Sequence, residues 1–374
     1  MKKIITTVGT SIFFNYQKDN GTDELIQDLE QKSYYRYNEY KDDIKDLKDQ
    51  IRNWINGHNN KENICAEIKS ILKLNKKFSN SFLDIHLLTS DTILSNIAAE
   101  IIEEYFTEIN NINIKKIVLI KDLQVEDDKK FKNGLINLII EVENICSNYY
   151  ENVIFNITGG YKAIIPYITI MAQINGCDIY YIFEDTDSLI KIPKTPIQVD
   201  FKIIEENFNL LKELDNGIDN YQQWQSINYS KLEDINGFID TDGDIALLSP
   251  LGKIFLYKYE NKFFIFYASD KVWKDINNKK EILRILKTKF CFKILRESKT
   301  EQKNIHIVFD DGDNQNRIFY FESDNKLYIY NVFTNHKKSD DFIRKVLLID
   351  KEKIKNESKK RIIEIENKEV NEYV

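Results

Sequence analysis

The sequence predicts a mostly parallel, doubly wound α/β sheet in the first half of the chain, followed by smaller modules. Short apolar runs alternate there with longer segments of helical period, and two of these runs end in turns that combine glycines with hydroxyl side chains. The composition changes after Pro193 and Pro196, which predicts a first domain over residues 1–198. With 374 residues, 42% of them hydrophobic, the chain can bury several cores, which excludes a disordered protein.

The elements of this first domain follow one another in a regular order. Strand-like apolar runs occupy residues 2–8, 82–88, 115–120, 152–157 and 178–183. Helical periodicity marks residues 23–55, 62–74, 128–148 and 161–172, and residues 89–92 cap a further helix that runs to about Phe106. Strands that alternate with helices are joined by crossovers, so we expect a parallel sheet with helices on both faces.

Residues 199–260 have the pattern of a winged helix. Helices are predicted over residues 201–215, 221–227 and 231–235, and a hairpin over 245–259 around Pro250. Winged helices often bind DNA, but residues 201–258 hold 5 Lys and Arg against 10 Asp and Glu. That charge is the wrong sign for a duplex backbone, so a spacer or dimerisation role is favoured.

The basic part of the chain is a single block over residues 261–350. Residues 262–350 hold 18 Lys and Arg against 13 Asp and Glu, whereas the whole chain has a net charge of −7. A polyanionic partner is therefore expected to bind there. Strands over 262–267, 303–309, 317–321 and 326–333, with helices over 270–290 and from about residue 340, predict a small α+β domain.

The last segment, residues 351–374, alternates Lys and Glu at helical spacing and predicts a solvated helix, with docking to a partner as the alternative. The four cysteines are widely spaced and contain no Cys-x-x-Cys pair, so neither a disulfide framework nor a zinc site is indicated and a reducing cytoplasm fits. No apolar run approaches about 18 residues, so no membrane partner is expected. Residues 185–188 are interpreted as a solvated turn rather than a calcium site, and we expect neither a metal nor a cofactor.

The first candidate site is built from two turns that each follow a strand. A helix start next to glycines presents backbone amides and partial positive charge, which suits an anion such as a phosphodiester. In an open α/β sheet, such turns meet beyond the carboxyl ends of the strands. The alternative is that the glycine pair serves only the steric needs of a tight turn. The candidate ligand-binding residues are Gly9, Thr10, Ser11, Thr158, Gly159, Gly160, Tyr161 and Lys162.

Residues 8–11 and 156–162 together resemble the CRISPR-associated Rossmann fold (CARF) sensor domain, and the resemblance covers about residues 1–195. In that family the two turns bind a cyclic oligoadenylate across the two-fold axis of a dimer. The resemblance therefore implies a homodimer with a cyclic oligoadenylate as activator, and the expected ring is cyclic tetraadenylate. Whether the sensor domain also degrades its ligand, as some relatives do, stays open.

The second candidate site lies on the strands of the basic block. Residues two apart share a face of a strand, so Asn304 and His306 are predicted to point together while Ile305 and Ile307 point into the core. Histidines beside cations can move a proton from an RNA 2′-hydroxyl to the leaving 5′-oxygen without a metal. The candidate catalytic residues are His306, Arg317, His336, Lys337 and Lys338. The alternative is a solvated basic edge.

Residues 262–350 resemble the RelE-type toxins, which are ribosome-dependent messenger-RNA interferases. The resemblance implies that Arg317 stabilises phosphate, that His306 lies on the strand carrying basic catalytic residues, and that 336–338 form the basic turn. Phe342 falls where those toxins often carry a tyrosine, so it can stack on a base but leaves the role of general base to a histidine. It also implies messenger RNA and the ribosome as partners.

The order of the modules is similar to the CARF–RelE CRISPR-associated messenger-RNA interferases. That resemblance implies an endoribonuclease of type III CRISPR antiviral defence, switched on by a cyclic oligoadenylate. The competing hypothesis is a ligand-controlled transcription regulator whose winged helix binds DNA, which requires basic side chains in the middle module. This chain carries its excess cations in residues 262–350 instead.

Overall fold

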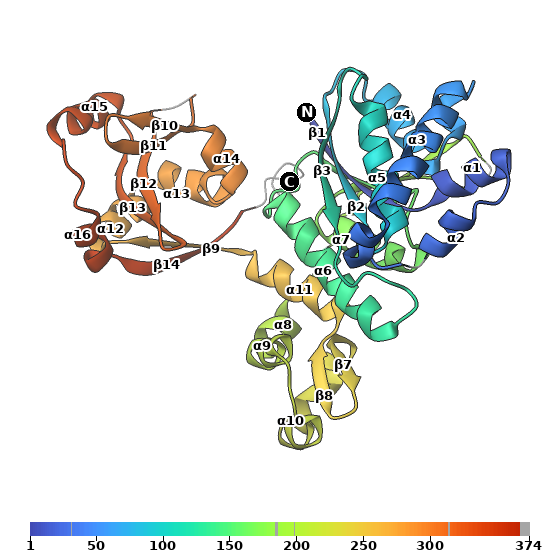
Figure 1. Cartoon of the computed structure of the whole chain (residues 1–374). Coiled ribbons are helices and arrows are strands. Elements are labelled where there is room, and N and C mark those ends of the chain that lie inside the picture. Colours follow the sequence, from blue (N-terminus) through green and yellow to red (C-terminus); the bar gives the residue numbers. More distant parts are fainter. Residues whose placement is uncertain (31, 184–185, 198, 313–314, 367–374) are drawn as a thin grey trace. The chain divides into compact units, whose positions relative to one another are not determined.

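The computed structural model describes residues 1–30, 32–183, 186–197, 199–312 and 315–366. The chain forms two compact units: residues 1–146 with 150–256, and residues 147–149 with 257–374 (Figure 1). In the described part, no helix is both long and apolar enough to span a bilayer.

The first unit is built on a six-stranded sheet with the order β3-β2-β1-β4-β5-β6. Five of its strands are parallel and β6 pairs antiparallel with β5, so the expected mixed α/β fold is confirmed. The strands are β1 Lys2–Val8, β2 Leu83–Thr89, β3 Ile112–Leu119, β4 Val153–Asn156, β5 Asp178–Ile182 and β6 Leu189–Ile192. The sequence did not predict β6.

Helices cover both faces of this sheet. One cluster joins the apolar residues of five helices to Ile4, Val8 and Ile85 of the strands. Those helices are α1 Ser11–Asn20, α2 Glu24–Leu29, α3 Lys41–Gly57, α4 Ala66–Lys77 and α5 Ile93–Phe106. Helices α6 Asp128–Cys146 and α7 Ile165–Ile174 lie on the opposite side of the sheet (Figure 1). The expected helical stretch over 23–55 is divided by a 3-10 segment at Tyr34–Tyr40.

The middle module contains four helices and a two-stranded hairpin. They are α8 Lys202–Glu206, α9 Phe208–Asn216, α10 Tyr221–Ile235, β7 Ile239–Asp242, β8 Ile245–Leu248 and α11 Pro250–Glu260. The expected hairpin over 245–259 is wrong, because the turn lies at Gly243 and the chain is helical from Pro250. Ser249 starts that helix, since its Oγ accepts a hydrogen bond from the Gly252 amide at 3.1 Å. The winged helix itself stays a prediction.

The second unit has its own six-stranded sheet, ordered β10-β11-β12-β13-β9-β14. The strands are β9 Phe263–Ala268, β10 Thr300–Lys303, β11 His306–Asp310, β12 Arg317–Ser323, β13 Lys326–Phe333 and β14 Lys359–Glu364. One face packs on α12 Asp270–Asn278, α13 Lys280–Ile285 and the π-helical turn Leu286–Phe290, which α14 Lys293–Ser298 follows. The other face packs on α15 His336–Lys345.

The prediction of a helical tail over 351–374 is wrong for much of the segment. Only α16, Lys351–Glu357, is helical, and β14 then pairs antiparallel with β9 over six residue pairs. Ile363 is 6% exposed and joins the core, whereas Ile362 is 54% exposed. Burial of alternate side chains and the unpaired edge of β9 favour the strand over a solvated helix. Residues 367–374 lie outside the described residues.

Candidate functional site

The two predicted turns lie side by side at the carboxyl edge of the first sheet. Strands β1 and β4 are hydrogen-bonded neighbours, with Thr6 opposite Asn156. Thr7 Oγ1 donates a hydrogen bond to the Gly159 carbonyl at 2.5 Å, so the end of β1 contacts the second turn directly. The sheet order changes direction between β1 and β4, which is where open α/β sheets bind ligands. We call residues 9–11 and 158–162 the turn pair.

Steric contacts explain the glycines of the turn pair. A Cβ on Gly9 would lie 2.8 Å from the Gly160 amide nitrogen, and a Cβ on Gly159 would overlap the Glu67 side chain. Gly160 has a φ of +86°, in the region that favours glycine. The structure therefore supports the steric explanation for Gly9 and Gly159, while leaving a ligand-binding role for the turn pair as a prediction.

Glu67 fills the space between the two turns and was missed by the sequence analysis. It lies in the first turn of α4 and is 1% exposed. The Gly9 amide donates to its Oε1 at 2.7 Å, and the Ser11 hydroxyl donates to its Oε2 at 3.1 Å. Ser11 Oγ in turn accepts from the Ala66 amide at 3.2 Å. A carboxylate of the chain thus occupies the position that was expected to receive an external anion.

The hydroxyl of Thr158 is also engaged within the chain. It donates to Asn156 Oδ1 at 2.8 Å and accepts from the Ile182 amide at 3.2 Å. The amide group of Asn156 donates to Ser70 Oγ at 2.8 Å. These bonds tie β4 to β5 and α4, so the Thr158 side chain supports the turn rather than projecting from it.

The outer part of the turn pair is the part open to a ligand. Thr10 and Lys162 are exposed, and Lys162 begins the 3-10 turn Lys162–Ile164 that leads into α7. Tyr161 is half-buried beside Ser90. Burial raises the pKa of the Tyr161 phenol, and the Ser90 hydroxyl opposes this shift. The side chains of Thr10, Tyr161 and Lys162 therefore lie at this rim.

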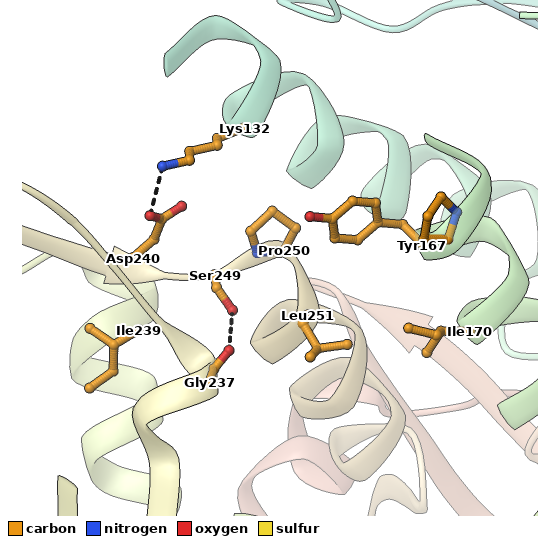
Figure 2. Close-up of a pocket in the computed structure, with 10 residues that line it drawn as sticks. Lys132, Tyr167, Ile170, Gly237, Ile239, Asp240, Ser249, Pro250 and Leu251 are labelled. Atoms are coloured by element: carbon orange, nitrogen blue, oxygen red, sulfur yellow. Dashed lines mark hydrogen bonds and ion pairs between the residues drawn. The ribbon is translucent and has the colours of Figure 1, made fainter. Parts of the chain in front are cut away.

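A pocket of about 410 Å³ lies between α6, α7 and the middle module (Figure 2). Lys132 forms an ion pair with Asp240 at 2.9 Å at one side of it. Figure 2 shows the Tyr167 hydroxyl pointing toward Pro250, the first residue of α11. The described lining of this pocket includes no residue of the turn pair. Helix α7, which follows the second turn in the chain, lines the pocket.

The second candidate site is a contact among Arg317, His336 and Asp310, which we call the arginine cluster. Arg317 Nη2 lies 2.9 Å from His336 Nδ1 and 2.6 Å from Asp310 Oδ2. The three residues come from the start of β12, the start of α15 and the end of β11. The Arg317 side chain is 4% exposed, whereas His336 is exposed. The structure therefore brings the predicted Arg317 and His336 together.

His306 does not reach this cluster. Asn304 has a φ of +55° and lies in the turn of the β10–β11 hairpin. The strand predicted over 303–309 therefore begins only at His306, and its predicted facing is wrong. Ile305 and Ile307 are exposed by 43% and 37%, and His306 is 0% exposed. Its Nδ1 lies 2.9 Å from the Tyr330 hydroxyl and its Nε2 lies 3.0 Å from the Val346 carbonyl. Both ring nitrogens have hydrogen-bond partners, so His306 belongs to the buried packing between the sheet and α15.

The remaining predicted residues lie on α15. Lys337 and Lys338 are exposed in its first turn, next to His336. The Asn335 side chain caps this helix by accepting from the Lys338 amide at 3.2 Å. Phe342 is half-buried, with its ring 5.3 Å from that of His306, so it belongs to the packing of the sheet face.

In the acidic loop after β11, the Asp311 carboxylate points into the second unit. Asp311 pairs with Lys289 and Lys299, and its side chain is 1% exposed. Burial raises the pKa of Asp311, but the two ammonium groups outweigh it and hold the pKa below its usual value. Asp313 lies outside the described residues.

The acidic turn after β5 is partly described. Asp185 lies outside the described residues, and Asp187 pairs with Lys69 at 2.5 Å. Across the described ranges, no group of three or more His, Cys, Asp and Glu side chains is arranged to hold a metal ion.

Part of the chain is similar to a known protein family. Residues 62–195 match a family model described as CRISPR-associated protein (Cas_APE2256). The matched segment includes Glu67 and the second turn of the turn pair, and the match supports a role in CRISPR defence. No curated protein matches the chain.

Proposed function

We propose that this CRISPR-associated chain is an endoribonuclease of type III defence, switched on by a cyclic oligoadenylate and cleaving messenger RNA without a metal. The observation that carries the proposal is the position of the turn pair, at the switch point of a parallel sheet within a chain that matches a CRISPR-associated family. The resemblance of the turn pair to CARF sensor domains supports the nature of the ligand.

The ligand contacts in this proposal come from the outer part of the turn pair. A phosphodiester approaches Lys162 and the amides at the start of the 3-10 turn, where charge and backbone dipoles favour an anion. Thr10 contacts the ligand from the other turn. Two chains bind one ring, since a cyclic oligoadenylate is itself symmetric and a two-fold dimer presents the same surface twice.

The arginine cluster supplies the chemistry in this proposal. Arg317 donates to a ring nitrogen of His336, and a nitrogen that accepts a hydrogen bond carries no proton. When Arg317 moves its hydrogen bond from this nitrogen to the phosphoryl oxygens, the freed lone pair takes the proton of the 2′-hydroxyl as the 2′-oxygen attacks the phosphorus. The bond to the 5′-oxygen breaks, the leaving 5′-oxygen takes a proton from water, and a 2′,3′-cyclic phosphate forms. The protonated His336 returns its proton to the hydroxide that remains, which restores the base. Arg317 stabilises the charge on the phosphoryl oxygens, and Lys337 and Lys338 hold the RNA backbone.

The test measures ligand binding and messenger-RNA cleavage in the same protein. Cyclic tetraadenylate is added to the wild type, with and without ribosomes, and to Lys162→Ala and Lys115→Ala. Lys115 is an exposed lysine of β3 and serves as the charge-matched control. We expect Lys162→Ala to weaken binding by about tenfold or more and to reduce cleavage, because it removes the full charge at the turn. Tight, salt-sensitive binding to duplex DNA without any cleavage would favour the transcription regulator instead.

A further inference from the structure

The carboxylate of Glu67 imitates a bound anion at the Gly9–Ser11 turn. Its described partners there are a backbone amide and a hydroxyl, at 2.7 and 3.1 Å. These are the neutral donors that a phosphate oxygen would use at the end of a parallel strand. The side chain is 1% exposed, so solvent does not screen its charge.

The same carboxylate also excludes other groups from this position. It lies against Gly159, where even a single added Cβ would overlap it, so no phosphate oxygen fits between the two turns while Glu67 stays in place. Beneath it, Ser70 and Asn156 are already hydrogen-bonded to each other. Among the described residues of the turn pair, the exposed ones are Thr10 and Lys162, so a ligand anion is placed at this outer rim.

We propose that Glu67 determines the affinity and the charge selectivity of the turn pair, an inference that rests on the proposed ligand-binding function. Its charge opposes every anion at the rim, and it opposes a dianion more than a monoanion. A phosphodiester carries one negative charge, whereas a terminal phosphate carries nearly two. Glu67 thus favours a cyclic oligoadenylate over a linear oligoadenylate with a terminal phosphate.

The test compares two ligands on three proteins. Calorimetry measures binding of cyclic tetraadenylate, and of linear tetraadenylate with a terminal phosphate, to the wild type, Glu67→Gln and Glu62→Gln. Glu62 precedes α4, and its side chain is 44% exposed and paired with Lys73, so its variant removes the same charge without touching the turn pair. We expect Glu67→Gln to tighten binding of the cyclic ligand by about tenfold or more, and that of the linear ligand further still. Glu62→Gln is expected to leave both affinities within about twofold of the wild type.

Different failures have different meanings. If neither ligand binds the wild type or any variant, the proposed ligand-binding function is wrong. If the wild type binds cyclic tetraadenylate and Glu67→Gln binds it equally or more weakly, the proposal for Glu67 is wrong and the proposed function stands. Glu67→Ala replaces the Gln variant if that one does not fold. Failure of both to fold would also overturn the proposal, because the carboxylate would then be a requirement of the fold.

Discussion

Arg317 Nη2 lies 2.9 Å from Nδ1 and 3.1 Å from Nε2 of His336, although the two residues are 19 apart in the chain. The intervening strands bring them together, because Arg317 at the start of β12 pairs with Phe333 at the end of β13. Helix α15 begins three residues later at His336, which places the His336 side chain next to Arg317. The contact is thus a consequence of the β12–β13 register.

This contact predicts a loss of activity when His336 is changed. His336→Ala should lower the rate of messenger-RNA cleavage by about a hundredfold or more, since a general base contributes about that much. The measurement is the single-turnover cleavage rate with cyclic tetraadenylate present. Lys345→Ala, which removes a cation from the last turn of the same helix, is the control and should retain most of the activity. A His336→Ala protein that cleaves at the wild-type rate would contradict the proposed chemistry.

Asp310→Asn should destabilise the second unit. Asp310 and Arg317 are 12% and 4% exposed, so the substitution removes the carboxylate charge from a buried ion pair with the guanidinium. The free energy of unfolding should fall by roughly 3 kcal/mol, measured by urea denaturation. Asp324→Asn removes a carboxylate that is 73% exposed and paired with Lys355, so it should have a negligible effect. Equal effects of the two substitutions would argue against a buried ion pair.

Gly159→Ala should disturb the turn pair through Glu67. The new methyl group would overlap the carboxylate, so the free energy of unfolding should fall by roughly 2 kcal/mol or more. Combining it with Glu67→Ala should restore part of that loss, because the overlapping atoms are gone. Gly57→Ala is the control, since a Cβ there meets nothing within 4 Å. Additive effects in the double-mutant cycle would mean that the two residues are not in contact.

Thr158→Val should act on stability. It removes the hydroxyl that bonds Asn156 and the Ile182 amide, which leaves two buried polar groups without this partner. The free energy of unfolding should fall by roughly 2 kcal/mol, measured by denaturation. Thr107→Val, at the exposed end of α5, should cause a much smaller change. An unchanged stability of Thr158→Val would contradict the supporting role of this hydroxyl.

His86 predicts how stability depends on pH. Burial lowers its pKa to about 4, and the Lys3 ammonium adds to the shift. Between about pH 6.5 and 4, His86 binds a proton in the unfolded chain but not in the folded one. The stability contribution of neutral His86 is therefore fully present above this window and is lost as the pH falls through it. The loss should be roughly 1 kcal/mol after allowance for partial exposure. His86→Gln should flatten this part of the pH profile, and an unchanged slope would show that His86 is not the cause.

Much of the fold was predictable because its signals are local. The five parallel strands and their crossover helices follow from apolar runs that alternate with helical periods. The approach of the two turns followed from the rule that parallel strands end at the same edge. Arg317 and His336 are in contact, as expected for residues of one strand edge, and their catalytic role stays a prediction.

Other features could not be predicted from the sequence, because they depend on small backbone changes or on contacts between distant segments. Asn304 has a left-handed backbone and lies in a turn where a strand was predicted, and β11 then places His306 on its buried face. The segment 359–364 has a helix-like charge pattern, yet the open edge of β9 selects a strand. Glu67 resembled any acid in the first turn of a helix, so nothing in its surroundings along the chain marked it as buried.

The sequence by itself determined where strands, helices, glycine turns and cations occur, because hydrophobic period and backbone freedom act over a few residues. Only the tertiary structure decided which partner each polar group in these elements has. Glu67 reaches the Gly9 amide from 58 residues away, and β12 and β13 must pair before Arg317 can meet His336. Partners of buried polar groups are set by the packing of distant segments, since each buried donor or acceptor must find whichever group that packing brings near.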